Sequence, residues 1–200
     1  TVVFRDGRAV GHNTDWSGFA RAFDRGLPDA ALGRVVLLGA GGAGAAVAHA
    51  LLTLGTGRLT VLDVDAGRAR ALAASLADRF GADRAAGGAV AGVADALAGA
   101  DGLVHATPTG MAAHPGLPLP ADLLRPDLWV ADIVYRPLET ELVRTARAAG
   151  CRVLDGGGMA VFQAVDAFRL ITGVEPDAER MLAHFSTLIA APDPGVRIAR

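Results

Sequence analysis

Six short apolar segments, separated by helical stretches, constrain most strongly what this chain can fold into. The segments are residues 34–40, 58–65, 88–93, 101–108, 128–135 and 151–157, of which 88–93 is the weakest. They are continuous apolar runs rather than apolar/polar alternations, which is typical of parallel strands buried on both faces. Because helices are predicted at 41–55, 66–81 and 137–150, the sequence indicates an α/β fold with a doubly wound, parallel six-stranded sheet.

Further elements flank this core. Residues 1–5 and 9–11 read as a hairpin with a turn at Asp6-Gly7, a helix is expected over about 15–24, and two more over 158–173 and 175–191. A lone hairpin is marginally stable, so we expect it to belong to a sheet whose remainder precedes residue 1, and the chain to be a fragment. Residues 191–200 are expected to be a mobile tail.

Composition narrows the class of partner. The 200 residues carry a net charge of -2 and no lysine, because all 19 basic residues are arginines. No basic patch points to nucleic acid, no apolar run is long enough to span a membrane, and no Cys/His spacing suggests a metal site. A small-molecule partner is favoured. The single cysteine, Cys151, cannot form an internal disulfide, so a cytoplasmic location is expected.

A glycine-rich turn joins the first apolar segment to its helix. In "GAGGAG", Gly39 permits the tight turn, Gly41 lets the backbone approach a pyrophosphate, and Gly44 allows close helix–strand packing. The amides of Gly42 and Ala43 open the helix, whose positive end favours an anion. With a strand before and a helix after, this is the setting of the dinucleotide-binding fingerprint, in a Rossmann-type fold.

An acidic residue ends the next predicted strand, 19 residues past Gly44. A carboxylate at Asp63 can accept both ribose hydroxyls of an adenosine and repels a 2′-phosphate, which favours NAD over NADP. Asp65 adds a second negative charge. Arg68 is the counter-indication, because its guanidinium could reach a phosphate, although a helix-surface role is the simpler interpretation.

Several stretches in succession resemble the shikimate dehydrogenase family, most closely its bacterial NAD-using quinate/shikimate dehydrogenase branch. They are "GHNTDWSGF", "VVLLGAGGAGAAVAHAL", "ATPTGM", "ADIVYRPLETELVRTARAAG" and "GGGMAVFQAVDAFRLITG". The resemblance implies NAD(P)-dependent oxidation of shikimate or quinate to the 3-dehydro ketone, within aromatic biosynthesis or quinate breakdown, by a monomer or homodimer. It also implies residues 1–24 as the end of a substrate domain with a connecting helix, 25–157 as the dinucleotide-binding domain, and 158–190 as helices packing back toward the substrate domain.

Residue roles follow from the same resemblance. Asp15 corresponds to the catalytic aspartate, whose partner lysine would precede residue 1, so the chain alone should be inactive. Tyr135 and Gln163 are implied as substrate contacts, and a general base within reach of the hydroxyl fits the chemistry. The remaining cofactor contacts implied are Thr107, Thr109, Val134, Gly158 and Met159.

The sequence leaves open which residue caps the first helix and what role His105 has. Thr14 or Asp15 could cap the helix that follows them. His105, where the family usually has Asn, could be an acid/base, but a structural role at a strand end is favoured.

Two alternative functions also stay open. The chain could be a paralogue acting on another cyclic polyol acid, or a non-catalytic NAD-binding regulatory module.

Overall fold

The computed structural model describes residues 1–190, and its centre is a six-stranded parallel sheet. The strand order is β5-β4-β3-β6-β7-β8, the doubly wound arrangement expected from the sequence. The strands are β3 (Arg34–Leu38), β4 (Arg58–Asp63), β5 (Ala85–Ala89), β6 (Gly102–His105), β7 (Trp129–Asp132) and β8 (Arg152–Leu154). The predicted fold class is therefore confirmed.

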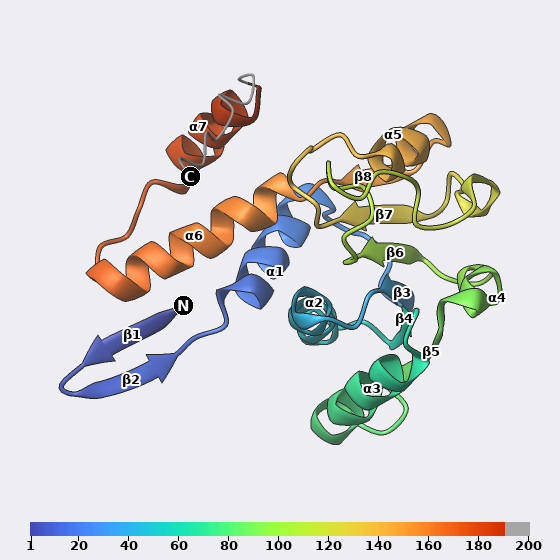
Figure 1. Cartoon of the computed structure of the whole chain (residues 1–200), viewed down its shortest axis with the longest axis horizontal. Helices are drawn as coiled ribbons and strands as arrows, with labels where there is room; N and C mark the ends of the chain where they lie inside the picture. Colours follow the sequence, from blue (N-terminus) through green and yellow to red (C-terminus); the bar gives the residue numbers. More distant parts are fainter. Residues whose placement is uncertain (191–200) are drawn as a thin grey trace, which may run out of the picture.

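Helices cover both faces of this sheet (Figure 1). Successive side chains of a strand point to opposite faces, so Val35 and Leu37 pack with one helix layer and Val36 and Leu38 with the other. The first layer holds α1 (Thr14–Gly26), α2 (Gly42–Thr53), α3 (Ala66–Phe80) and the start of α6 (Gly157–Thr172). The second holds η1 (Val90–Gly92), α4 (Val93–Leu97), η2 (Ala121–Leu123) and α5 (Glu141–Ala148).

The expected strand at 88–93 is misplaced. The fifth strand runs over Ala85–Ala89, and the chain turns helical from Val90. Its small residues are required by packing, because a Cβ on Gly87 would lie 2.3 Å from the backbone oxygen of Ala69 in α3. A strand that must accept a helix so closely lacks the β-branched residues that identify strands in a sequence.

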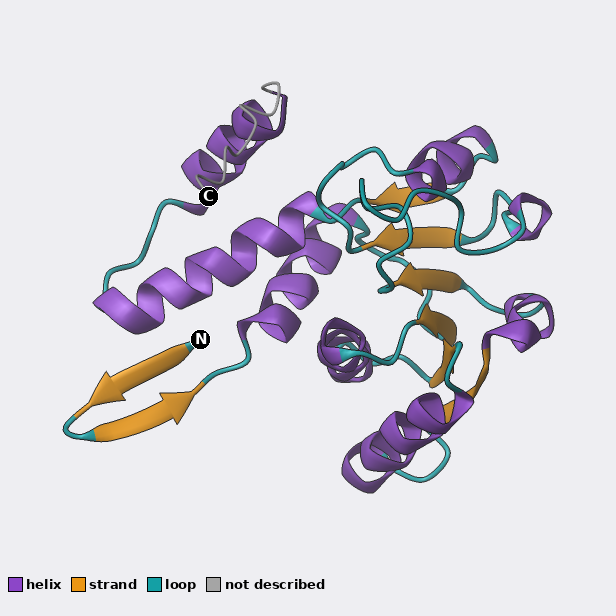
Figure 2. Ribbon diagram, viewed as in Figure 1, coloured by secondary structure: helices purple, strands orange, loops and turns teal. Residues whose placement is uncertain are grey.

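The hairpin stands apart from the six-stranded sheet, beside the end of α6 (Figure 2). It consists of β1 (Val2–Arg5) and β2 (Arg8–Gly11), with positive φ at both Asp6 and Gly7, as the predicted turn requires. Phe4 is 78% exposed, so the hairpin has little core of its own. A hydrogen bond from the Arg5 side chain to the backbone oxygen of Leu170 links the hairpin to α6.

Helix α6 packs antiparallel against α1, and α7 (Ala178–Ala190) packs on α6. The α1–α6 contact is tight because a Cβ on Gly18 would come 2.7 Å from the backbone nitrogen of Gln163. The predicted tail at 191–200 lies outside the described residues. Within residues 1–190, no helix is both long and apolar enough to cross a bilayer.

Candidate functional site

The residues expected to bind a dinucleotide gather at one edge of the sheet. The carboxyl ends of parallel strands share an edge, and ligands of open α/β sheets bind there. The glycine loop follows β3, Asp63 ends β4, and the segments with Thr107 and Val134 follow β6 and β7. Because β3 lies between β4 and β6, these four segments are neighbours in space.

Two glycines of the loop, Gly39 and Gly44, are required because a larger residue would clash with the backbone nearby. Gly39 has φ of +104°, and a Cβ there would lie 2.5 Å from the backbone oxygen of Ala106. A Cβ on Gly44 would lie only 2.0 Å from the backbone oxygen of Gly39. Their roles in the tight turn and in helix–strand packing are therefore visible in the geometry.

At the other two glycines, Gly41 and Gly42, the packing of the protein does not require a glycine. A Cβ on Gly41 or Gly42 would meet no atom within 4 Å, and both residues are exposed. Helix α2 begins at Gly42, and its N-cap, Gly41, provides no side-chain hydrogen bond. The first turn of α2 has no acidic residue, so no side chain of that turn offsets the positive end of the helix dipole. This cradle fits a pyrophosphate.

Asp63 is tied to that loop. The residue is 8% exposed, and its carboxylate accepts hydrogen bonds from the amides of Ala40 (2.7 Å) and Asp65 (2.9 Å). Burial by itself would raise the pKa of Asp63, but these two amides and the nearby Arg68 cation together hold the pKa below its ordinary value. The carboxylate is thus charged and anchored, with lone pairs left for ribose hydroxyls.

The two charged neighbours of Asp63 have different environments. Asp65 is the N-cap of α3, and its side chain accepts from the amides of Gly67 and Arg68. Arg68 is exposed on the first turn of that helix. Sequence reasoning treated Asp65 as an extra charge and missed its capping role, which the position before helix 66–81 could have indicated.

The segments after β6 and β7 meet through buried polar side chains. His105, the last residue of β6, has no exposed surface, as the favoured structural role requires. Its ring lies against Asp132, the last residue of β7, and against the Thr107 hydroxyl. Thr107 in turn accepts a weak hydrogen bond from the Thr109 amide at 3.3 Å.

The glycines at the start of α6 pack closely against the segment after β7 and against α1. A Cβ on Gly156 would lie 2.5 Å from the backbone oxygens of both Ile133 and Val134. A Cβ on Gly158 would lie 3.0 Å from Cβ of Ala22 in α1, so this glycine allows the two helices to pack closely. Met159 is 8% exposed and belongs to the core at this end of the helix.

The start of α1 differs from expectation in one respect. Neither Thr14 nor Asp15 caps this helix, because the cap is Asn13, whose side chain accepts from the amides of Asp15 and Trp16. Asn13 has the extended backbone (φ -91°, ψ 100°) that a capping residue needs. Asp15 is then in the first turn, half-buried, and its carboxylate has no hydrogen-bond partner within residues 1–190.

The α1–α6 contact places Gln163 against Gly18, whose added Cβ would lie 2.7 Å from the backbone nitrogen of Gln163. Asp15 precedes Gly18 by three residues, which is a spacing that places two side chains on neighbouring positions of a helix surface. The buried carboxylate of Asp166 in α6 links the two helices by accepting from Ser17 (2.5 Å) and Arg21 (3.1 Å) of α1, and it also accepts from Arg169 of its own helix (3.3 Å).

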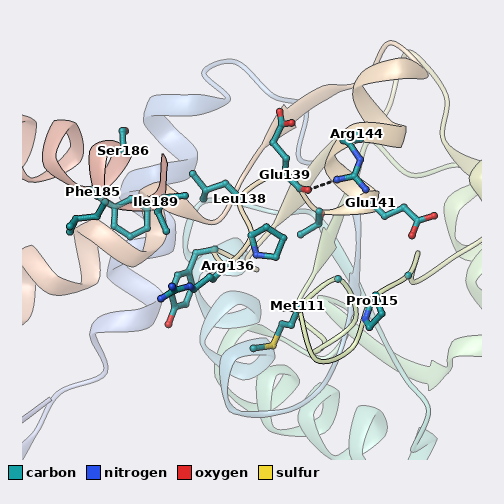
Figure 3. A pocket seen from close by; sticks show the side chains of 17 residues that line it. Met111, Pro115, Arg136, Leu138, Glu139, Glu141, Arg144, Phe185, Ser186 and Ile189 are labelled. Atoms are coloured by element: carbon teal, nitrogen blue, oxygen red, sulfur yellow. Dashed lines mark hydrogen bonds between the residues drawn. The ribbon is translucent and has the colours of Figure 1, made fainter. Parts of the chain in front are cut away.

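Tyr135 lies elsewhere, half-exposed in the loop after β7. It lines a cavity of about 890 Å³ between the segments 110–116 and 135–141 and helix α7, where Met111, Leu138 and Phe185 surround the space (Figure 3). Arg136, in the loop after β7, and Arg144 of α5 also line this cavity and were not predicted from the sequence. The position of Arg136 after a parallel strand could have indicated it. Within residues 1–190, no hydrogen bond or ion pair joins Tyr135 to Asp15 or Gln163.

A metal centre was not expected from the sequence. Within residues 1–190, no group of three His, Cys, Asp or Glu side chains is arranged to hold a metal ion.

The chain is similar to proteins of known activity, although no family model matches it. A protein named shikimate dehydrogenase (NADP(+)) from Streptomyces avermitilis is 70% identical over 188 residues, which are 94% of this chain and 65% of that protein. The solved structure of quinate dehydrogenase from Corynebacterium glutamicum with NAD is 51% identical, with a TM-score of 0.89 over 93% of this chain and 66% of that one.

A second similar structure is shikimate 5-dehydrogenase from Thermus thermophilus with shikimate. It is 37% identical, with a TM-score of 0.77 over 95% of this chain and 67% of that one. The chain thus spans about two thirds of the length of the relatives it matches.

Proposed function

Because the chain belongs to the shikimate dehydrogenase family, we propose that it is the nucleotide-binding part of an enzyme that oxidises quinate or shikimate to the 3-dehydro ketone with NAD(P). One observation supports this most directly. No protein atom lies within 4 Å of where a Cβ of Gly41 or Gly42 would project, and the anchored carboxylate of Asp63 holds the same loop through the Ala40 amide. A phosphate cradle next to an acidic strand end is the arrangement that a dinucleotide requires.

The cofactor contacts proposed from the sequence can be divided by the part of the dinucleotide that each would touch. The glycine loop with Gly42 and Ala43 would hold the pyrophosphate, and Asp63 the adenosine ribose. The nicotinamide half would extend the other way, across β6 and β7, because the adenosine lies over β4. The residues proposed there are Thr107, Thr109, Val134, Gly158 and Met159.

We propose NAD as the preferred cofactor. The carboxylate of Asp63 would accept from both ribose hydroxyls and repel a 2′-phosphate. The low pKa of this carboxyl keeps the charge in place throughout the neutral range. Arg68 is exposed and close enough to lower that pKa, so its positive charge would weaken the preference for NAD.

The cofactor, when bound, supplies the acceptor for a hydride from the carbinol carbon. The hydroxyl proton must pass to a base within hydrogen-bond reach. Asp15 is proposed to orient the substrate hydroxyl and the amine of a lysine that has no counterpart among these 200 residues. Its unpartnered carboxylate, held by a helix that Asn13 caps, suits that role. Gln163 and Tyr135 are proposed as further substrate contacts.

We also propose a cytoplasmic location. Burial raises the pKa of the Cys151 thiol, so the side chain stays protonated and poorly reactive. A single buried thiol is compatible with a reducing compartment.

Calorimetric titration with NAD and NADP, together with an assay for oxidation of quinate and shikimate, tests the function. The 200-residue chain is expected to bind NAD more tightly than NADP and to show no turnover, because half of the acid/base pair is absent. Turnover by this chain would contradict the lysine mechanism. Failure to bind either dinucleotide would overturn the proposal.

A further inference from the structure

A chain of buried polar side chains crosses the carboxyl edge of the sheet beneath the proposed nicotinamide half. His105 and Asp132 are paired in register as the last residues of β6 and β7, and both are at most 1% exposed. The ring nitrogen Nδ1 of His105 lies 3.0 Å from Oδ1 of Asp132. The mechanism proposed above makes no use of this pair.

The Asp132 carboxylate is held from several sides. Its Oδ1 also accepts from the amide of Val134 at 3.0 Å, and its Oδ2 accepts from the hydroxyl of Thr140 at 2.6 Å. Thr140 is 1% exposed and is the N-cap of α5, accepting from the amide of Val143 at 3.1 Å. The carboxylate therefore stands at the junction of β6, the segment after β7, and α5.

This arrangement selects one tautomer of a neutral His105 ring. Since the carboxylate can only accept, Nδ1 carries the proton and Nε2 is an acceptor. The Thr107 hydroxyl lies 2.5 Å from Nε2 and can donate to it, which leaves its oxygen to accept from the Thr109 amide. The side chains of His105, Asp132, Thr140 and Thr107 thereby all have hydrogen-bond partners, as a stable buried polar network requires.

Both ends of the network emerge at the proposed site. The Thr107 methyl lies 3.1 Å from where a Cβ on Gly39 would be, so Thr107 rests against the glycine loop. At the other end, the hydrogen bond from the Val134 amide sets the chain direction after β7. His105 has no exposed surface and cannot itself touch a ligand.

We propose that His105 is a positioning residue, which through Asp132 and Thr140 holds Thr107 and Val134 in place for the nicotinamide half of the dinucleotide. This inference rests on the proposed function. It predicts that damage to the network weakens binding of the nicotinamide half and spares the adenosine half, which Asp63 and the glycine loop hold separately.

Titration with two ligands separates the halves. NAD contains both, whereas ADP-ribose has the adenosine and pyrophosphate but no nicotinamide. In His105→Leu, NAD affinity is expected to fall about tenfold, as for the loss of one buried hydrogen bond, with ADP-ribose affinity changed by less than about twofold. His105→Asn should restore NAD affinity to within about threefold of wild type, because its amide N–H can replace Nδ1–H as a donor to Asp132.

A matched control is available. Thr56 is also a fully buried threonine, but its hydroxyl has no hydrogen-bond partner within residues 1–190. Thr140→Val should lower NAD affinity selectively, whereas Thr56→Val should leave both ligands unaffected. If His105→Leu does not fold, Thr140→Val tests the same network from a residue outside the proposed cofactor contacts, because it removes the hydroxyl that donates to Asp132.

The outcomes are distinct. A parallel loss of NAD and ADP-ribose affinity, or no loss of either in His105→Leu and Thr140→Val, would overturn the positioning role while leaving the proposed function standing. If the wild-type chain binds neither ligand, the proposed function itself fails.

Discussion

The amide of Ala40 donates a hydrogen bond of 2.7 Å to Oδ2 of Asp63, so the carboxylate proposed to bind ribose also anchors the glycine loop. Two parts of one binding site, 23 residues apart in the chain, are thereby coupled. Any change at Asp63 will act on the pyrophosphate cradle as well as on the ribose. A test of cofactor selectivity must separate these two effects.

Replacement of Asp63 by asparagine is expected to weaken both NAD and NADP but to narrow the difference between them. Affinity for both cofactors should fall because the glycine loop loses an anchor. The carboxylate accepts hydrogen bonds from two backbone amides, whereas the Asn side chain has an NH₂ group, a donor, in place of one oxygen. The narrowing comes from removing a charge near the 2′-phosphate, an effect of ~1–4 kcal/mol at contact distance. The ratio of the two Kd values, measured by titration, isolates this second effect. Equal affinities in the wild-type chain would refute the charge argument at the outset.

Alanine substitutions in the glycine loop should divide into two classes. Gly44→Ala is expected to destabilise the fold by about 3 kcal/mol, because the new Cβ would lie 2.0 Å from the oxygen of Gly39. Gly41→Ala should change stability by less than about 0.5 kcal/mol, since its Cβ meets no atom and its backbone is extended. It should nevertheless weaken NAD binding, because the Cβ enters the cradle. Urea denaturation and NAD titration of both variants provide the comparison, and unchanged NAD affinity in Gly41→Ala would count against a pyrophosphate there.

Substitutions of the α1 cap, Asn13, and of the proposed catalytic residue, Asp15, should differ in their effect on stability. Asn13→Ala is expected to lower the free energy of unfolding by about 1 kcal/mol, because two amides lose their acceptor. Asp15→Asn should cost less, since the carboxylate has no hydrogen-bond partner in the described chain and gains only from the helix dipole, roughly 0.3–1 kcal/mol. Urea midpoints measure both. A larger loss in Asp15→Asn than in Asn13→Ala would show that Asp15 has a structural role.

A histidine between three helices should make stability depend on pH. His49 of α2 contacts the rings of Trp16 and Phe80, with centroid distances of 5.2 Å and 5.3 Å. Burial and the positive charge of Arg79 lower its pKa in the folded state. The unfolded chain therefore binds the proton more readily, and stability is lost as pH falls below about 6.5, the unfolded value.

Urea denaturation at several pH values between about 5 and 8 measures that loss, around the ordinary histidine pKa. His49→Phe keeps an aromatic ring between Trp16 and Phe80 and has no proton to bind, so its stability should vary less over this range. An equally steep dependence in His49→Phe would assign the effect to other groups.

Sequence patterns were most reliable where the structure is locally determined. The apolar runs gave β3, β4, β6 and β7, and the glycine spacing located the turn at Gly39 and the start of α2, because each depends on burial or on backbone conformation within a few residues. The strand near residue 88 was misplaced for the opposite reason. Gly87 is small because Ala69 of α3 approaches it, and that contact is invisible along the chain.

The cap of α1 shows the same limit on a smaller scale. Asn13, Thr14 and Asp15 are all residue types that can cap a helix. Only the extended backbone at Asn13 decides between them, and that conformation depends on how the hairpin feeds into the helix.

By itself, the sequence determined the order of strands and helices, the glycine loop and the acidic strand end, because periodicity and residue type record local burial and backbone freedom. Tertiary structure alone decided that His105 meets Asp132 and that Gly18 of α1 meets Gln163 of α6. These partners are 27 and 145 residues apart, counted between their sequence positions, and their contact depends on strand register and helix crossing. No pattern within one segment encodes that geometry, since it is set by the packing of both segments against the common core.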